Sequence, residues 1–343
     1  MDSLIEAAEK NFEANTPLNS QSRLPMKVLK MSLFKRLLPR QNNETQSQAL
    51  TAHIRNVVNE VKDTSSSEYE NVFANLLSVF YYENAICPTD DTHLLIDLIS
   101  VALKMKMNGD VNKLIRIGVN SEFIKSELIA DEEERETRSR FFETCSLAYN
   151  LTRNMEKALE LLRDVEQRTD MNFSICLFNN VIESCMKCKH EQVAENLLEE
   201  YSENVDEEIR HNYQIVCTMI TGYSKLGKVD KAFEIYTMMV QKKIEQSNLA
   251  NTLSDETHFL NTATLNSFLE CLVKKNYIKD AEVIFHYHLK TSGIVDLNCV
   301  SILIRGFCKS KQLGKALELC EILPEVNIEP TQQFFTSFLE ACV

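Results

Sequence analysis

Two fifteen-residue stretches decide the fold: GYSKLGKVDKAFEIY (Gly222–Tyr236) and GFCKSKQLGKALELC (Gly306–Cys320). Three more align with them without gaps: CLVKKNYIKDAEVIF, SCMKCKHEQVAENLL and AYNLTRNMEKALELL, which begin at Cys271, Ser184 and Ala148. The eleventh residue of every stretch is alanine, at Ala158, Ala194, Ala232, Ala281 and Ala316. Successive alanines are separated by 36, 38, 49 and 35 residues. A period of this length is typical of a repeat protein.

Each unit reads as two helices joined by a short turn. Leu265, Phe268 and Leu272 recur at helical spacing before one such turn, and Ala281 and Phe285 recur after it. A small alanine lets the two helix axes approach closely. One hairpin cannot bury both of its faces, so neighbours must stack. We therefore expect an all-α fold, a right-handed superhelical array (α-solenoid) of helix–turn–helix repeats of about 35 residues with an extended concave surface.

The chain divides into an N-terminal extension and two regions of the array. Residues 1–44 form an extension that is acidic and then basic, and we expect it to be partly disordered. Residues 45–138 hold divergent helical hairpins, of which KMKMNGDVNKLIRIG (Lys104–Gly118) places Leu114 in the alanine slot. Residues 139–343 hold the regular repeats, with a polar loop inserted near 248–261. The final QQFFTSFLEACV (Gln332–Val343) reads as a first helix without its second, so either the chain is shortened or this end docks on another molecule.

The composition bears on the secondary structure, on membrane insertion, on the redox compartment and on the kind of partner. Glycine (7) and proline (6) are scarce, which favours helices over strands joined by tight turns. No run of apolar residues is long enough to cross a membrane. Eleven cysteines without a secretory signal indicate free thiols in a reducing compartment. The net charge of −13 counts mildly against a nucleic-acid partner, although acidic runs such as Asp131–Glu136 are typical of solvated turns.

Residues 139–343 resemble the pentatricopeptide repeat family. The resemblance is carried by LNSFLECLVKKNYIKDAEVIF, by VSILIRGFCKSKQLGKALELC and by the closing NIEPT (Asn327–Thr331). With the alanine counted as position 20, a tetratricopeptide repeat would require a small residue at position 8. The chain has large aliphatic residues there, at Ile182, Ile220, Leu269 and Ile304. The pentatricopeptide resemblance is therefore the better one.

The resemblance implies that each repeat reads one RNA base through position 5 and through its last residue. The residues at these positions are Asn179, Asn212, Cys217, Asn266, Asp296, Ser301 and Thr331. Asn266 with Asp296 resembles the pair that prefers uracil, and Asn179 with Asn212 resembles a pyrimidine-preferring pair. Position 2, usually a branched aliphatic that sandwiches the base, departs from the family at Cys176, Gln214, Ala263 and Asn298. Weaker stacking is expected from these residues.

Position 13 is lysine in four successive repeats, at Lys187, Lys225, Lys274 and Lys309. One lysine per repeat is suitably spaced to meet consecutive RNA phosphates. The alternative is that each lysine only complements the helix dipole near a helix C-terminus.

Other site chemistry is not supported. Cys185, Cys188 and His190 resemble part of a zinc site, but a structural site needs four ligands and no second CxxC follows. The sequence has no nucleophile motif, phosphate loop or HExxH. We therefore expect no cofactor, no metal, no small-molecule substrate and no enzymatic activity.

The expected function is non-catalytic binding of single-stranded RNA in RNA processing, stability or translation. The alternatives are a protein-interaction scaffold, which the acidity favours, and the targeting half of a nuclease such as protein-only ribonuclease P. RLPMKVLKMSLFKRLLPR (residues 23–40) has basic residues and no acid, and resembles a mitochondrial transit peptide. A mitochondrion or another organelle is therefore expected. The cytoplasm is the alternative because the first 20 residues are no presequence; segment 23–40 would then be a helix that docks on the array or a partner.

Overall fold

The computed structural model describes residues 54–56, 58–59, 73–74, 76–78, 80–81, 91–125, 131–168, 173–205, 207–250, 260–291, 295–324 and 329–342. The extension 1–44, with its basic segment 23–40, lies outside the described residues, as does most of 45–90. The described residues contain helices and no strand, in two compact units, Met1–Leu177 and Phe178–Val343. None of the described helices has the length and apolar character needed to cross a bilayer.

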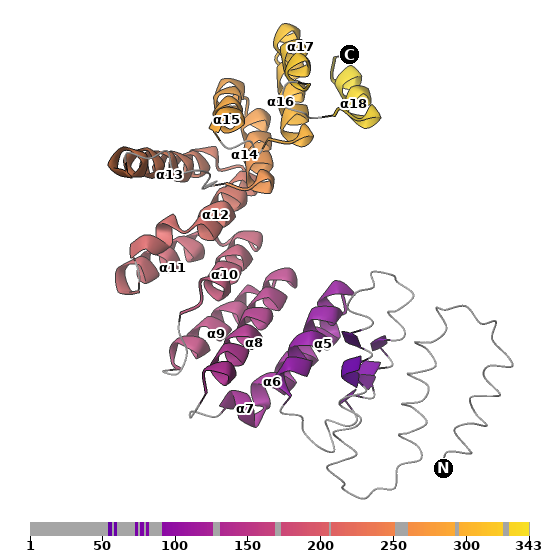
Figure 1. Cartoon of the computed structure of the whole chain (residues 1–343), viewed down its shortest axis with the longest axis vertical. Helices are drawn as coiled ribbons and strands as arrows, with labels where there is room; N and C mark the ends of the chain where they lie inside the picture. The colour runs from indigo at the N-terminus through magenta and orange to yellow at the C-terminus, as the bar shows by residue number, and fades with distance from the viewer. Residues whose placement is uncertain are drawn as a thin grey trace, which may run out of the picture. The chain divides into compact units, whose positions relative to one another are not determined.

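The second unit is built from stacked helical hairpins. Its first helices are α10 (Ile175–Lys187, which enters this unit at Phe178), α12 (Tyr213–Leu226), α14 (Thr262–Lys274) and α16 (Leu297–Lys309), followed by α18 (Gln332–Cys342). Its second helices are α11 (Glu191–Asn204), α13 (Val229–Ala250), α15 (Ile278–Thr291) and α17 (Leu313–Ile322). Successive first helices from α12 to α18 pack against one another, and Figure 1 shows α12, α14 and α16 in sequence. The prediction of an all-α array of stacked hairpins is confirmed.

The first unit has the same kind of hairpin. Helices α5 (Thr92–Lys104) and α6 (Asn108–Asn120) pair, as do α8 (Glu132–Leu151) and α9 (Met155–Glu166), and α5 packs on α8. The short helix α7 (Glu122–Lys125) contacts α6.

Every hairpin turns in the same way. The residue two places before each second helix has a positive φ: Lys106, Arg153, Lys189, Gly227, Asn276 and Lys311. The next backbone N–H donates to the carbonyl five residues earlier, for example Tyr277 to Leu272 at 2.8 Å. This left-handed helix cap is the Schellman motif. Only one of the six residues is glycine, so the turn is held by these hydrogen bonds and by packing.

The common turn corrects one alignment. Because Lys106 has the positive φ and α6 begins at Asn108, Val111 takes the alanine slot of that hairpin. The assignment of Leu114 to that slot was therefore wrong by three residues. Both side chains are buried, so hydrophobicity alone could not separate them.

The repeated alanine lies where the two helices of a hairpin cross. All five alanines, Ala158, Ala194, Ala232, Ala281 and Ala316, are fully buried. A larger side chain at this contact would force the helices apart. The period seen in the sequence is thus the period of closest helix approach.

The insertion after α13 differs in part from the expected loop. Helix α13 continues to Ala250, so residues 248–250 are helical rather than part of a loop. Residues 251–259 lie outside the described residues. Leu260, two residues before the start of α14, is fully buried.

The described cysteines are free thiols, as predicted. One buried cysteine lies in each of five first helices, namely Cys145, Cys185, Cys217, Cys271 and Cys299 on α8, α10, α12, α14 and α16. Burial raises the pKa of Cys185 and of Cys299 to about 12. These thiols remain protonated at neutral pH.

Candidate nucleic-acid interface

The first helices of the second unit present one uncovered face. Each begins at position 1 of its repeat, and positions 2, 5, 9 and 13 fall on one side because they are three or four residues apart. We call this side the open face. It consists of Cys176, Asn179, Glu183 and Lys187; Gln214, Cys217, Thr221 and Lys225; Ala263, Asn266, Glu270 and Lys274; and Asn298, Ser301, Arg305 and Lys309. All of these except Cys217 are at least partly exposed, whereas the residues at positions 3, 4, 7 and 8 of the four helices are all buried.

The open face is basic although the chain is acidic. It holds four lysines and one arginine against two glutamates, within a protein of net charge −13. The acidic residues of the chain are therefore concentrated elsewhere. A basic strip of this kind is the electrostatic feature that a nucleic-acid backbone requires.

The four predicted phosphate-binding lysines lie on this face but differ in their partners. The Lys187 Nζ atom lies 2.9 Å from a Glu183 carboxylate oxygen, and the Lys274 Nζ atom lies 2.9 Å from Glu270. Lys225 and Lys309 are exposed and form no ion pair with any residue that the structure describes. All four occupy the last turn of their helix, so they also complement the helix dipole.

Asn266 and Asp296 meet directly. The Asn266 amide nitrogen donates to both carboxylate oxygens of Asp296, at 3.3 and 3.2 Å. The amide oxygen of Asn266 is buried and has no hydrogen-bond partner among the described residues. The structure thus brings together the pair on which the uracil expectation depends.

The other predicted base-reading residues are arranged differently. The Asn179 amide oxygen accepts a hydrogen bond of 2.8 Å from Thr218, and no hydrogen bond joins Asn179 to Asn212 in the described part of the chain. The Ser301 hydroxyl donates to the Leu297 carbonyl of its own helix at 2.7 Å. Among the described residues, neither Asn179 nor Ser301 forms a hydrogen bond with its expected partner.

The last residue of each repeat caps the next first helix. The side-chain oxygen of Asn212 accepts from the Gln214 N–H at 3.0 Å, and that of Asp296 accepts from the Cys299 N–H at 2.8 Å. Thr331 accepts from Phe334 in the same way, at 3.2 Å. Residues that were selected as base readers are therefore also N-caps, a structural role that stabilises each helix.

The partner of Cys217, which the insertion concealed in the sequence, is Asn261. Asn261 caps α14 by accepting from the Thr264 N–H at 2.8 Å, so it occupies the last position of the lengthened repeat. Burial raises the pKa of Cys217, while a hydrogen bond from the Asn261 backbone lowers it. Cys217 is only 5% exposed, which leaves little of its side chain for a ligand.

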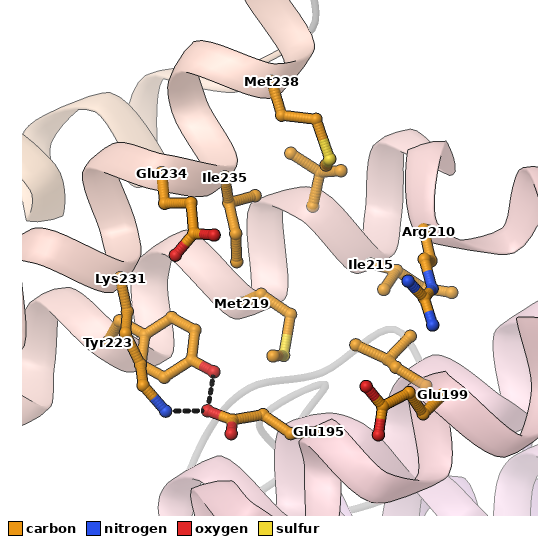
Figure 2. A pocket seen from close by; sticks show the side chains of 12 residues that line it. Glu195, Glu199, Arg210, Ile215, Met219, Tyr223, Lys231, Glu234, Ile235 and Met238 are labelled. Atoms are coloured by element: carbon orange, nitrogen blue, oxygen red, sulfur yellow. Dashed lines mark hydrogen bonds and ion pairs between the residues drawn. The ribbon is translucent and has the colours of Figure 1, made fainter.

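A separate cleft is lined by residues of α11, α12 and α13 (Figure 2). Its volume is about 310 Å³, and its floor includes Ile215 and Met219. At one end Glu195 accepts hydrogen bonds from Tyr223 and Lys231. Burial alone would raise the pKa of Glu195, but these two bonds lower it below its ordinary value. An ion pair at one end of the cleft thus links two successive hairpins.

The cysteine and histidine cluster considered for zinc is part of a hairpin. Cys185 is fully buried in α10, where its backbone carbonyl accepts from the His190 N–H of the turn. Among the described residues, no group of three or more histidine, cysteine or carboxylate side chains is arranged to hold a metal ion.

Comparison with known proteins identifies the kind of repeat at two places in the chain. Residues 215–244 and 299–328 match the family model of the PPR repeat. Both matches begin at position 3 of a first helix, on α12 and α16, and so share the register of the structure. No curated protein matches the chain.

Solved structures of pentatricopeptide repeat proteins are also similar. The pentatricopeptide repeat protein PPR10 from maize aligns at 10% identity with a TM-score of 0.49, over 99% of this chain and 53% of that one. PPR10 in complex with an 18-nucleotide psaJ RNA element aligns at 14% identity with the same TM-score, over 99% of this chain and 50% of that one. The chain spans about half the length of these structures.

Together the fold and the open face define a helical repeat protein whose hairpins share one register. The two repeat matches show that the chain contains pentatricopeptide repeats, at residues 215–244 and 299–328, as its sequence predicted.

Proposed function

We propose that this protein binds single-stranded RNA along the open face and does not itself catalyse a reaction. The observation that carries the proposal is the contact of Asn266 with Asp296, at 3.2 to 3.3 Å, on a face that is basic in an acidic chain. Repeats of this family read one base each. Two features of the structure support this proposal: a fixed polar pair and a cationic strip.

The Asn266 amide is well suited to a pyrimidine. Its NH₂ group has two hydrogens, and one suffices for the bond to Asp296. Asp296 is itself fixed by the Cys299 N–H, so the amide is oriented before any ligand arrives. A base carbonyl, such as those of uracil, can accept the remaining hydrogen. Preorganisation of this kind lowers the entropy lost on binding.

Affinity should be modest and salt-sensitive. The position 2 side chains Cys176, Gln214, Ala263 and Asn298 are all exposed beside the position 5 residues. None is the branched aliphatic or aromatic side chain that would stack well on a base. Backbone electrostatics must then supply a large share of the binding free energy, and this share falls as salt rises.

The test is fluorescence anisotropy with labelled oligo-U and oligo-A at several salt concentrations. Wild-type protein should prefer oligo-U, and Asn266→Ser should reduce the ratio of the two affinities by about tenfold. Asn196→Ser on α11 makes the same chemical change away from the open face and should leave the ratio unchanged. Absence of any binding at micromolar protein and low salt would contradict the proposal.

A protein-interaction role is the second candidate, and the cleft of Figure 2 favours it. Glu199 and Glu234 lie exposed at its rim above an apolar floor that includes Met219 and Met238. A basic, apolar segment of a partner protein would complement this surface. The anisotropy result separates the two candidates, since an RNA-binding protein must retain oligo-U and a scaffold need not.

The biological setting is part of the same proposal. The family resemblance favours RNA processing, stability or translation in a mitochondrion or another organelle. A reporter fused to residues 26–50 should then enter that organelle, and a reporter that stays in the cytosol would reject this part.

A further inference from the structure

The open face changes in character from one hairpin to the next. On α10 and α14, position 5 is asparagine, and the lysine at position 13 is paired with the glutamate at position 9. On α12 and α16, position 5 is Cys217 or Ser301, position 9 is Thr221 or Arg305, and the lysine at position 13 has no ion-pair partner among the described residues. The alternation therefore involves three positions at once.

The paired lysines are poor phosphate ligands. In each pair the lysine ammonium group already forms an ion pair with the glutamate carboxylate at 2.9 Å, and the pair has no net charge. A hydrogen bond from Lys274 and the nearby charge of Arg305 lower the pKa of Glu270 despite its partial burial, so this carboxylate is ionised at neutral pH. An RNA phosphate would have to displace this carboxylate and would be repelled by it.

The unpaired lysines have the opposite combination. Lys225 and Lys309 are exposed, and the residue one turn before each of them is neutral or positive: Thr221 and Arg305. Their position 5 neighbours offer little to a base. Cys217 is 5% exposed, and the Ser301 hydroxyl hydrogen is used within its own helix at 2.7 Å.

We infer that alternate hairpins divide the work: α12 and α16 hold the RNA backbone, while α10 and α14 read bases. Glu183 and Glu270 are then the residues that switch off phosphate binding on the reading hairpins. The inference rests on the proposed function. It adds that the RNA is held at every second repeat rather than at each one.

The difference is measurable as a salt dependence. Each phosphate neutralised on a single strand contributes about 0.7 to the slope of log K against log salt. Two lysines therefore contribute about 1.4, whereas four would contribute about 2.8. If a variant and the wild type bind equally well at 1 M salt, a slope smaller by about 1.4 makes the variant roughly 25-fold weaker at 0.1 M salt.

Three variants of the full chain separate the possibilities on oligo-U. Lys225→Gln with Lys309→Gln should lower the slope by about 1.4. The quadruple variant Glu183→Gln, Lys187→Gln, Glu270→Gln and Lys274→Gln removes both complete pairs without changing net charge, and should leave affinity and slope as in wild type. Glu183→Gln with Glu270→Gln frees two lysines and should raise the slope by about 1.4.

The inference is overturned if the quadruple variant loses as much affinity as the Lys225 and Lys309 variant, because the paired lysines would then hold phosphates. It is also overturned if freeing Lys187 and Lys274 leaves the slope unchanged. Wild-type protein that binds no RNA would instead defeat the proposed function, so the two failures are distinct. Circular dichroism of each variant verifies that the helices are retained.

Discussion

Adding one methyl group to Gly222 tests the close approach of successive first helices. A Cβ atom built at Gly222 on α12 would lie 2.9 Å from the Met186 Cβ atom, 3.0 Å from its Cγ and 2.5 Å from its Cε, on α10. The Cε atom can swing away. The Met186 Cβ atom is fixed to the α10 backbone, so Gly222→Ala requires the two helices to separate by a few tenths of an ångström.

The expected change in the free energy of unfolding is the difference between a gain in helix propensity and a cost of overpacking. Replacing glycine by alanine within a helix stabilises it by about 1 kcal/mol. Overpacking a close contact costs about 1–3 kcal/mol. Gly222→Ala should therefore lower the free energy of unfolding by up to about 2 kcal/mol. Gly314→Ala on α17 is the matched control, because its added Cβ has nothing within 4 Å and only the helix term acts.

Urea denaturation followed by circular dichroism measures both variants. Gly222→Ala should be less stable than Gly314→Ala by about 1–3 kcal/mol, the overpacking term alone. In a Met186→Gly background the cost of Gly222→Ala should shrink, since the Met186 Cβ atom that it meets at 2.9 Å is gone. Equal stability of the two glycine variants, or no coupling to Met186, would refute the close contact between α10 and α12.

The structure also predicts how several other substitutions change the stability of the fold. Gly227→Ala should destabilise by about 1–2 kcal/mol, because alanine is strained at a φ of 72°, whereas Arg153→Gly relieves such strain and should raise the urea midpoint. Asn261→Ala should cost about 1 kcal/mol by removing the cap of α14, and a thermal melt would show it. Glu195→Gln should destabilise at pH 7. Its pKa is lowered in the fold, so this loss should be full above the ordinary value of 4.5 and should vanish as pH falls through the lowered pKa. A stability difference between wild type and this variant that grew toward low pH would contradict the assigned hydrogen bonds.

The repeat register was predictable because it depends on a strict steric requirement. Only a small residue fits where two helices of a hairpin cross, and all five alanines found in the sequence are fully buried there. The same rule failed at the α5–α6 hairpin, where Val111 takes the place of alanine. The position of the turn could not be read from the sequence, because the residue with the positive φ is Lys106 and not a glycine.

The open face was only partly predictable. Helical spacing placed Asn266 and Lys225 on it correctly, because positions three and four residues apart share a side. Glu183 and Glu270 were overlooked, although each lies four residues before a lysine and such pairs are readable from sequence. Asn261 could not be found, because the insertion before α14 changes the count from Cys217 to the end of its repeat.

Five of the six described hairpins carry one buried cysteine on their first helix, and each of these thiols can report the opening of its own hairpin. A thiol reacts with an alkylating reagent as the thiolate, so burial and a raised pKa protect Cys145, Cys185, Cys217, Cys271 and Cys299 until the surrounding helices open. Since each lies on a different first helix, the modification rate of each reports the local opening of one hairpin in the native protein. Mass spectrometry after timed alkylation would therefore reveal which end of the described array frays first, without any engineered label.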